Sequence, residues 1–219
     1  MNAYAVMKRL CRITDDAYEE ALKNFPRFTT EMDVARFINR YFRKHGVKPA
    51  FRTIVANNAA EIHHWASKCK LRRGFVIIDI GARDKGLSSD MSRTFFIGQP
   101  TPKEKRLYEL VRNCQTKCCE IVKVNSNGGT LDKHARKLLG KYAKYFLHSL
   151  GHGLGKKIHQ GPRISSNNPG IVRKGDFITI EPGIYITGRP SIGIRIEDTL
   201  YVSKDVEILT RSPKHLITV

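Results

Sequence analysis

The chain has 219 residues, of which 39 are Lys or Arg and 20 are Asp or Glu, so its formal net charge is +19. Hydrophobic residues make up 41% of it and charged residues 27%, a composition that fits a folded globular protein and excludes a collagen-like or disordered chain. No apolar run approaches the roughly eighteen residues of a membrane span, and no signal peptide precedes the first helix. We therefore expect a cytoplasmic protein with no membrane contact.

The excess of basic residues raises nucleic acid or the ribosome as a partner. The Lys and Arg residues are dispersed along the chain and interleaved with apolar ones, which is typical of a solvated surface. Contact with nucleic acid or the ribosome is therefore an alternative and not the leading interpretation. Five cysteines, three of them within residues 114–119, do not indicate a disulfide framework.

The first third of the chain predicts two helices. One runs to about Lys23, and a second starts at Thr30, where Thr30 and Asp33 resemble a capping box and Gly46 is a typical stop. Runs rich in β-branched and aromatic residues then predict strands at 51–55, 75–81 and 92–98.

Helices return over 102–124 and 130–145, separated by the Asn125–Gly129 run. The last third again predicts strands, at 177–186, 192–198 and 199–202. The order of helices followed by strands occurs twice along the chain. It indicates an α+β chain of two similar halves, roughly 1–100 and 101–219, within a single domain over 1–219.

Two acidic pairs lie within predicted hairpins. Asp79 and Asp90 are symmetric about a polar turn at 83–86, so we expect their side chains to be directly opposed. Opposed residues have Cβ atoms roughly 4.5 to 5.5 Å apart, where like charges destabilise the sheet. A shared proton, an arginine or a bound cation would offset the repulsion, and a cation is the commoner solution where carboxylates converge.

Glu181 and Glu197 repeat this arrangement about Arg189, and each follows an isoleucine. A charge within an apolar strand is costly unless it is paired or coordinates a metal. Two such pairs, on two hairpins in different parts of the chain, indicate one shared metal centre.

A nitrogen ligand is available in the segment HSLGHGLGKKIHQGP, which contains His148, His152 and His159 among closely spaced glycines. Four carboxylates and an imidazole, without a thiolate, suit Mn, Co or Fe at least as well as Zn. Four carboxylates also suit two divalent ions better than one. Because two-metal sites acidify water and polarise the bond under attack, hydrolysis is the expected reaction class.

The motifs IDIGA, SDMSRTF, HSLGHGLG followed by IH, TIEPGIYI and GIRIED occur in this order along nearly the whole chain. Together they resemble the pita-bread metallopeptidases, which include methionine aminopeptidases, aminopeptidase P and Xaa-Pro dipeptidases. The resemblance implies a curved antiparallel sheet covered by helices, in two pseudo-symmetric halves. It also implies an exopeptidase with two divalent ions, Mn or Co being favoured, that acts on Xaa-Pro peptides.

The same resemblance implies roles for individual residues. Asp79 would bind one ion, His152 and Glu181 the other, and Asp90 and Glu197 both. Glu181 would also move a proton, assisted by His148. The implied substrate contacts are His63 and His159 at the scissile region, with Tyr185 and Arg195 lining the site in the proline-specific branch. For His63 the match rests on AAEIHHWAS, in which His64 is the adjacent alternative.

The chain departs from the family's pattern in three places. Ser92 stands where Thr is usual, and Gln160 stands where Glu is usual. The N-terminal accessory domain of proline-specific members is expected to be absent, which leaves specificity and oligomeric state open. Methionine aminopeptidase is therefore the alternative enzyme, and a non-catalytic protein that binds RNA or the ribosome on a peptidase fold is the alternative of another class.

Overall fold

The computed structural model describes residues 2–219. Its N-terminal part begins with two helices, α1 (Ala3–Lys23) and α2 (Glu31–Lys44), joined by the short 3₁₀ helix η1 (Phe25–Arg27). Thr30 and Asp33 form the expected capping box, because each side chain accepts a backbone N–H of the other residue. Both helix predictions are confirmed.

These helices cover a three-stranded antiparallel sheet with the order β2-β3-β6. Its strands are β2 (Ile54–Asn57), β3 (Gly74–Ile80) and β6 (Met91–Ile97). A smaller sheet with the order β1-β4-β5 extends this half. It consists of β1 (Lys48–Pro49), β4 (Ala82–Asp84) and β5 (Leu87–Ser88).

The second half again begins with helices and ends with strands. Its helices are α3 (Pro102–Glu120), α4 (Gly128–Leu139) and the 3₁₀ helix η2 (Gly140–Tyr145). Five strands pair in the order β13-β12-β9-β7-β8, and β10 pairs with β11. The strands are β7 (Gly151–Leu154), β8 (Gln160–Ile164), β9 (Phe177–Ile180), β10 (Gly183–Ile186), β11 (Ile192–Arg195), β12 (Asp198–Val202) and β13 (Val206–Ile208).

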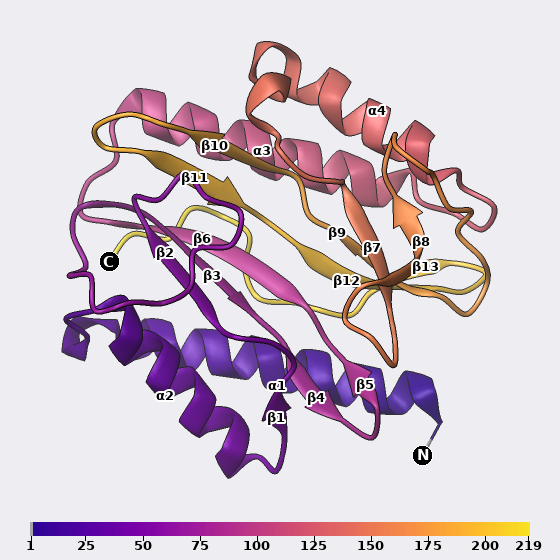
Figure 1. Ribbon diagram of the computed structural model, residues 1–219, viewed down its shortest axis with the longest axis horizontal. Coiled ribbons are helices and arrows are strands. Elements are labelled where there is room, and N and C mark those ends of the chain that lie inside the picture. The colour runs from indigo at the N-terminus through magenta and orange to yellow at the C-terminus, as the bar shows by residue number, and fades with distance from the viewer. Residues whose placement is uncertain (1) are drawn as a thin grey trace.

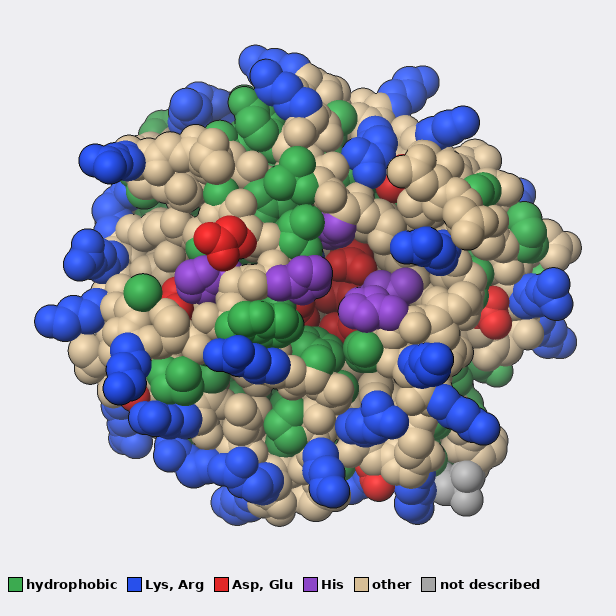
Figure 2. All heavy atoms as spheres, in the orientation of Figure 1, with side chains coloured by type: hydrophobic (Ala, Val, Ile, Leu, Met, Phe, Trp, Pro, Cys, Tyr) green, Lys and Arg blue, Asp and Glu red, His purple; other side chains and the backbone are tan. Residues whose placement is uncertain are grey.

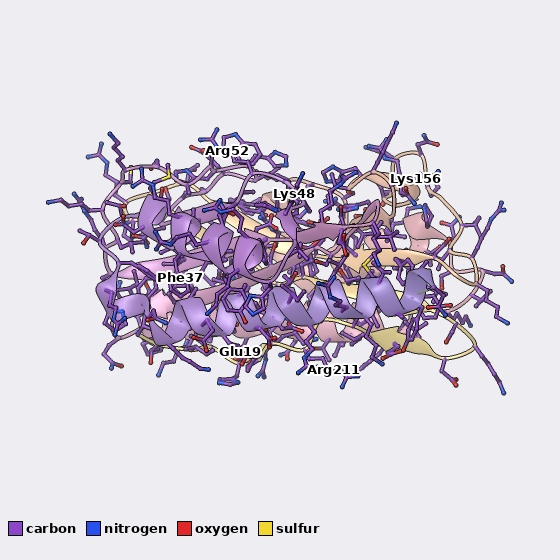
Figure 3. All side chains as sticks on the ribbon, turned by 90° about the horizontal axis from the view of Figure 1, so that it is seen from below. Glu19, Phe37, Lys48, Arg52, Lys156 and Arg211 are labelled. Carbon is purple, nitrogen blue, oxygen red and sulfur yellow. The ribbon has the colours of Figure 1, made fainter. Side chains whose placement is uncertain are left out.

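The strands lie between the two pairs of helices, with α3 and α4 on one side and α1 and α2 on the other (Figure 1). Figure 3 shows α1 and α2 from below, with the strands behind them. One apolar core joins α3 and α4 to the second half's strands, and another joins α1 and α2 to the first half's strands. The α+β prediction is confirmed. None of the helices within residues 2–219 is both long and apolar enough to cross a bilayer.

Two predicted helix ends are wrong. The third helix ends at Glu120 and not near residue 124, because the chain then turns and Asn125 adopts a positive φ of 69°. The fourth starts at Gly128, capped by Asn127, and ends at Leu139 because Gly140 takes a φ of 54°. The predicted helical residues that follow form η2.

The structure corrects one hairpin prediction. Asp79 pairs with Ser92, and not with Asp90, because the β4–β5 turn is centred on Lys85 and Gly86, which have φ values of 48° and 76°. This register places Asp90 two residues before the partner of Asp79. The two carboxylates are therefore diagonal neighbours on one face of the hairpin, and direct opposition was wrong.

The other hairpin prediction is confirmed by the register. Gly183 pairs with Arg195 on β10 and β11, and Ile180 pairs with Asp198 on β9 and β12. Because these pairs on either side of the two glutamates share one register, Glu181 lies opposite Glu197. Pro182 interrupts the predicted 177–186 strand at this point, so both glutamates lie in a short gap between the two pairs of strands.

Candidate metal centre

The five predicted metal ligands come from five separate places in the chain. Asp79 lies on β3, Asp90 precedes β6, His152 lies on β7, Glu181 follows β9 and Glu197 precedes β12. All five line one cavity of about 110 Å³. The same cavity is lined by His63, His159 and Arg195. The structure therefore brings the predicted set together at the centre of the sheets.

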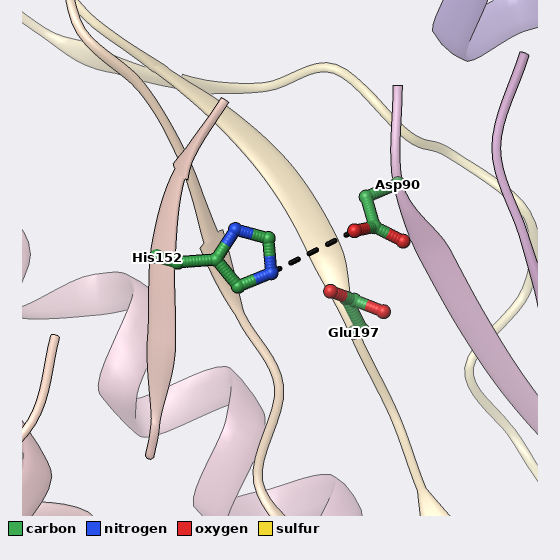
Figure 4. A group of neighbouring side chains, drawn as sticks. All are labelled: Asp90, His152 and Glu197. Atoms are coloured by element: carbon green, nitrogen blue, oxygen red, sulfur yellow. Dashed lines mark ion pairs between the residues drawn. The ribbon is translucent and has the colours of Figure 1, made fainter. Parts of the chain in front are cut away.

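The imidazole of His152 points toward the carboxylates of Asp90 and Glu197 (Figure 4). Its Nε2 is 3.4 Å from Oε1 of Glu181 and 3.7 Å from Oδ2 of Asp90. One ligand atom each of Asp90, His152 and Glu197 fall within 4.8 Å of one another. A divalent cation takes ligand atoms gathered at this spacing, so these side chains are suitably placed to share one.

Backbone contacts fix these side chains. Thr199 donates through Oγ1 to the carbonyl of Asp90 at 2.7 Å and accepts the amide of Asp90 at 3.2 Å. Gly151, which precedes His152, touches the neighbouring strand so closely that a Cβ there would lie 2.0 Å from the carbonyl oxygen of Thr179. Only glycine fits this approach, which explains the glycines around His152.

His152 is held as a neutral ligand. Its Nδ1 lies 3.2 Å from the carbonyl oxygen of Gly153, so Nδ1 carries the proton and the lone pair of Nε2 faces the carboxylates. Burial and, to a smaller extent, nearby His159 together lower the pKa of His152 to about 4. A neutral imidazole with a free Nε2 is the form that binds a metal.

The carboxylates repel one another in a buried place. Burial and the charge of Glu197 raise the pKa of Asp90 and of Glu181 well above the usual range. Burial and Asp79 raise the pKa of Glu197 to about 8. Oδ1 of Asp79 is buried and has no hydrogen-bond partner within residues 2–219. An oxygen-rich set with an orphaned oxygen and mutual repulsion fits divalent cations, as expected from the sequence.

Arg195 is the only Lys or Arg whose side chain contacts one of these four carboxylates within residues 2–219. Its Nη2 lies 2.6 Å from Oδ2 of Asp79, and its Nε donates to Ser92 at 2.8 Å. Ser92 in turn donates to Oε2 of Glu197 at 2.8 Å. The predicted residue Tyr185 lies behind this wall of the cavity, where its hydroxyl contacts Arg195 at 2.7 Å and His148 at 2.9 Å.

The remaining predicted histidines surround the opening of the cavity that holds the carboxylates. His63, His148 and His159 line a larger hollow of about 540 Å³ that adjoins the cavity. Burial and Arg195 lower the pKa of His148 to about 3, and burial lowers the pKa of His159. Figure 2 shows histidines around a central hollow with acidic side chains at its base and Lys and Arg around it.

Several residues of the site were not predicted from the sequence. Arg163 lines the larger hollow, and Phe51 and Trp65 line the cavity that holds the carboxylates. Trp65 is the only tryptophan of the chain and follows the His63–His64 pair, a signal that could have drawn attention to it. His64 faces away from the cavity and contacts Glu31, so of the two adjacent histidines His63 is the one at the site.

Comparisons with known proteins agree with this geometry. The Xaa-Pro dipeptidase of Pyrococcus horikoshii is 38% identical over 97% of this chain and 62% of its own length. The crystallised prolidase from Pyrococcus furiosus matches with a TM-score of 0.90 at 36% identity, over 96% of this chain and 64% of its own. An X-Pro aminopeptidase structure from Thermotoga maritima matches with a TM-score of 0.91 at 34% identity, over 97% of this chain and 62% of its own.

The chain thus spans a little under two thirds of the length of these relatives. The structural matches confirm the pita-bread fold that the motifs implied. The model of the metallopeptidase family M24 matches residues 5–204. The chain therefore belongs to metallopeptidase family M24.

Proposed function

We propose that residues 1–219 form the catalytic domain of a metal-dependent exopeptidase with two ions, which hydrolyses Xaa-Pro bonds in the manner of a prolidase or aminopeptidase P. The observation that carries this proposal is the cavity in which four carboxylates, those of Asp90 and Glu197 buried, converge with a neutral His152. The similarity to an Xaa-Pro dipeptidase, a prolidase and an X-Pro aminopeptidase supports the proline specificity.

In this proposal Asp79 would hold one ion and His152 and Glu181 the other, and Asp90 and Glu197 would help to hold both. Mn or Co is favoured, with Fe and Zn as alternatives, because the donor set is mostly oxygen. When bound, two divalent ions supply Lewis-acid polarisation of the scissile carbonyl and lower the pKa of water.

Glu181 is proposed to accept and return the proton of the attacking water. Burial and Glu197 raise its pKa, so this carboxylate holds a proton more readily than an exposed glutamate does. Its Oε2 lies 3.9 Å from Nδ1 of the neutral His148, beyond hydrogen-bond distance, so His148 would assist from beside this carboxylate. His63 and His159, on the mouth of the cavity, would contact the scissile region of the peptide.

Arg195 and Tyr185 are proposed to support the substrate side of the site. Arg195 lines the cavity, and Tyr185 holds both Arg195 and His148 through its hydroxyl. Tyr185 would therefore act by fixing the orientation of its two neighbours.

A metal analysis coupled to peptidase assays tests the function. Wild type with added Mn or Co is expected to cleave an Xaa-Pro dipeptide faster than a Met-Ala peptide, and Asp90→Ala is expected to lose both metal and activity. Preference for Met-Ala would replace the proposal with methionine aminopeptidase. Activity without bound metal, or bound metal without cleavage of either peptide, would refute both.

A further inference from the structure

His63 lies on a 16-residue connection between β2 and β3, residues 58–73, which we call the histidine loop. Asn58 closes this loop at its ends by donating through Nδ2 to the carbonyl of Arg73 at 2.8 Å. On the side of the metal centre, Nη1 of Arg195 donates to the carbonyl of Ile62 at 3.2 Å. The loop has no helix or named strand of its own, so its placement depends on contacts such as these.

The opposite side of the histidine loop is held by Glu31, the first residue of α2. The Glu31 side chain is 1% exposed, and a carboxylate so buried is costly unless donors surround it. Its Oε2 accepts from Ser67 through both N, at 3.1 Å, and Oγ, at 2.7 Å. Its Oε1 accepts the amide of Asn57 at 3.0 Å. Glu31 therefore joins the end of β2 to the far part of the loop.

The fourth donor is His64. Its Nε2 lies 3.0 Å from both oxygens of Glu31. Because an ionised carboxylate only accepts hydrogen bonds, Nε2 carries a proton and donates it. His64 thus points toward α2, while its neighbour His63 lines the cavity of the metal centre. Fixing one of two adjacent side chains fixes the backbone that directs the other.

The next residue ties the loop to the cavity wall. Trp65 forms an antiparallel bridge with Ile54 of β2. Its ring stacks on that of His63, with centroids 5.9 Å apart and an interplanar angle of 21°. Both rings line the cavity. The position of Trp65 therefore reports on the position of His63.

We propose that Glu31 and His64 are positioning residues, which hold the histidine loop so that His63 stays over the metal centre. The proposal rests on the proposed function, in which His63 contacts the scissile region. Glu31 and His64 lie outside the cavity lining and act on the reaction only through His63.

Trp65 makes the loop's position measurable, because it is the chain's only tryptophan. In His64→Ala we expect acrylamide to quench the fluorescence of Trp65 about two-fold more strongly, and kcat to fall about ten-fold, the factor expected for one hydrogen bond to a charged group. Metal content and KM should stay near their wild-type values. Unchanged quenching, or a lower metal content that accounts for the lost activity, would overturn the proposal.

Three further variants sharpen the test. His64→Gln keeps an N–H donor for Glu31 and should restore most of the activity lost in His64→Ala. Ser67→Ala removes the other side-chain donor to Glu31 and should give a smaller change in the same direction. Lys68→Ala changes an exposed residue of the same loop and should match wild type. Equal losses in His64→Gln and His64→Ala would contradict a role for the hydrogen bond.

A double-mutant cycle distinguishes positioning from an independent role. If His64 acts through His63, the variant with both His63→Ala and His64→Ala should be no slower than His63→Ala alone. Additive losses would overturn the proposal. If metal-loaded wild type cleaves no peptide, the proposed function fails by itself, and Trp65 quenching in His64→Ala then decides: an increase supports the positioning role and no change refutes it.

Discussion

Nη2 of Arg195 lies 2.6 Å from Oδ2 of Asp79, in a pair whose side chains are 2% and 13% exposed. The other nitrogens of this guanidinium are also used, Nε by Ser92 and Nη1 by Tyr185. The second oxygen of Asp79, Oδ1, is buried without a hydrogen-bond partner among the residues that the structure describes. Asp79 therefore uses one oxygen for the arginine and keeps the other for the proposed metal.

Replacing Arg195 should destabilise the metal-free protein. Arg195→Met leaves the mostly buried carboxylate of Asp79 without its cation and leaves the oxygens of Ser92 and Tyr185 without the N–H donors of Arg195, so we expect a loss of about 3–5 kcal/mol in the free energy of unfolding. Arg195→Lys keeps the positive charge but not the several N–H donors of the guanidinium, and its loss in the free energy of unfolding should be smaller. Urea unfolding with EDTA present measures both. Equal stability of wild type and Arg195→Met would show that the pair contributes nothing.

Ser92 connects Arg195 to Glu197 through one hydroxyl. Ser92→Ala removes the buried hydroxyl that accepts from Arg195 and donates to Glu197. It should lower the free energy of unfolding by about 1–3 kcal/mol. Ser92→Thr keeps the hydroxyl, so we expect it to lower the free energy of unfolding less than Ser92→Ala does. Chemical denaturation compares the two. A larger cost for Ser92→Thr than for Ser92→Ala would mean that the cavity wall has no room for the methyl group.

The sequence predicted the elements well where local patterns determine them. The capping box at Thr30 and the helix beginning at Pro102 depend on residues within one turn, and both are present. The register of the first hairpin was wrong by one residue at its turn, because the positive φ of Lys85 is not visible in residue type. Apolar periodicity does not show where a turn is centred.

The gathering of the predicted ligands was predictable, but their surroundings were not. Four carboxylates in apolar strands indicated a shared centre, and the structure brings them to one cavity. The contact of His64 with Glu31 joins residues 33 positions apart. Such pairs depend on how α2 packs against the loop, which no local pattern specifies. For the same reason the cavity wall formed by Trp65 was missed.

The metal-free protein should become less stable as pH rises. Burial and Asp79 raise the pKa of Glu197 from 4.5 to about 8. An acid with a raised folded pKa favours the folded state below its unfolded pKa, and this contribution is lost as pH rises through the folded pKa. Between about pH 7 and 8, where His148 and His152 are largely neutral in the folded and the unfolded chain alike, we expect a loss of up to about 1.4 kcal/mol per pH unit for each such proton.

The pKa values of Asp90 and Glu181 are raised as well, so their protons make the fall of stability with pH steeper. Urea unfolding in EDTA across this pH range measures it. Glu197→Gln carries no titrating proton at that position and should have a shallower slope. Stability that increases with pH in the wild type would contradict the raised pKa values.

Divalent metal should reverse this loss, because it binds the ionised carboxylates. At a free metal concentration about 100 times the Kd, one site adds about 2.7 kcal/mol, which for a chain of this size is a rise in Tm of roughly 5–10 °C. Thermal unfolding of wild type at pH 7.5 with Mn, and again after EDTA, measures the shift.

Two variants locate the site responsible for that shift. Asp90→Asn removes a carboxylate from the centre and should abolish most of the rise in Tm. Glu109→Gln is the matched control, because Glu109 is an acidic residue on the surface of α3 whose ion-pair partner is Arg112. It should keep the full rise. If Asp90→Asn keeps the full rise as well, the stabilising ions bind elsewhere, since removing a ligand from the cavity would then have left their affinity unchanged.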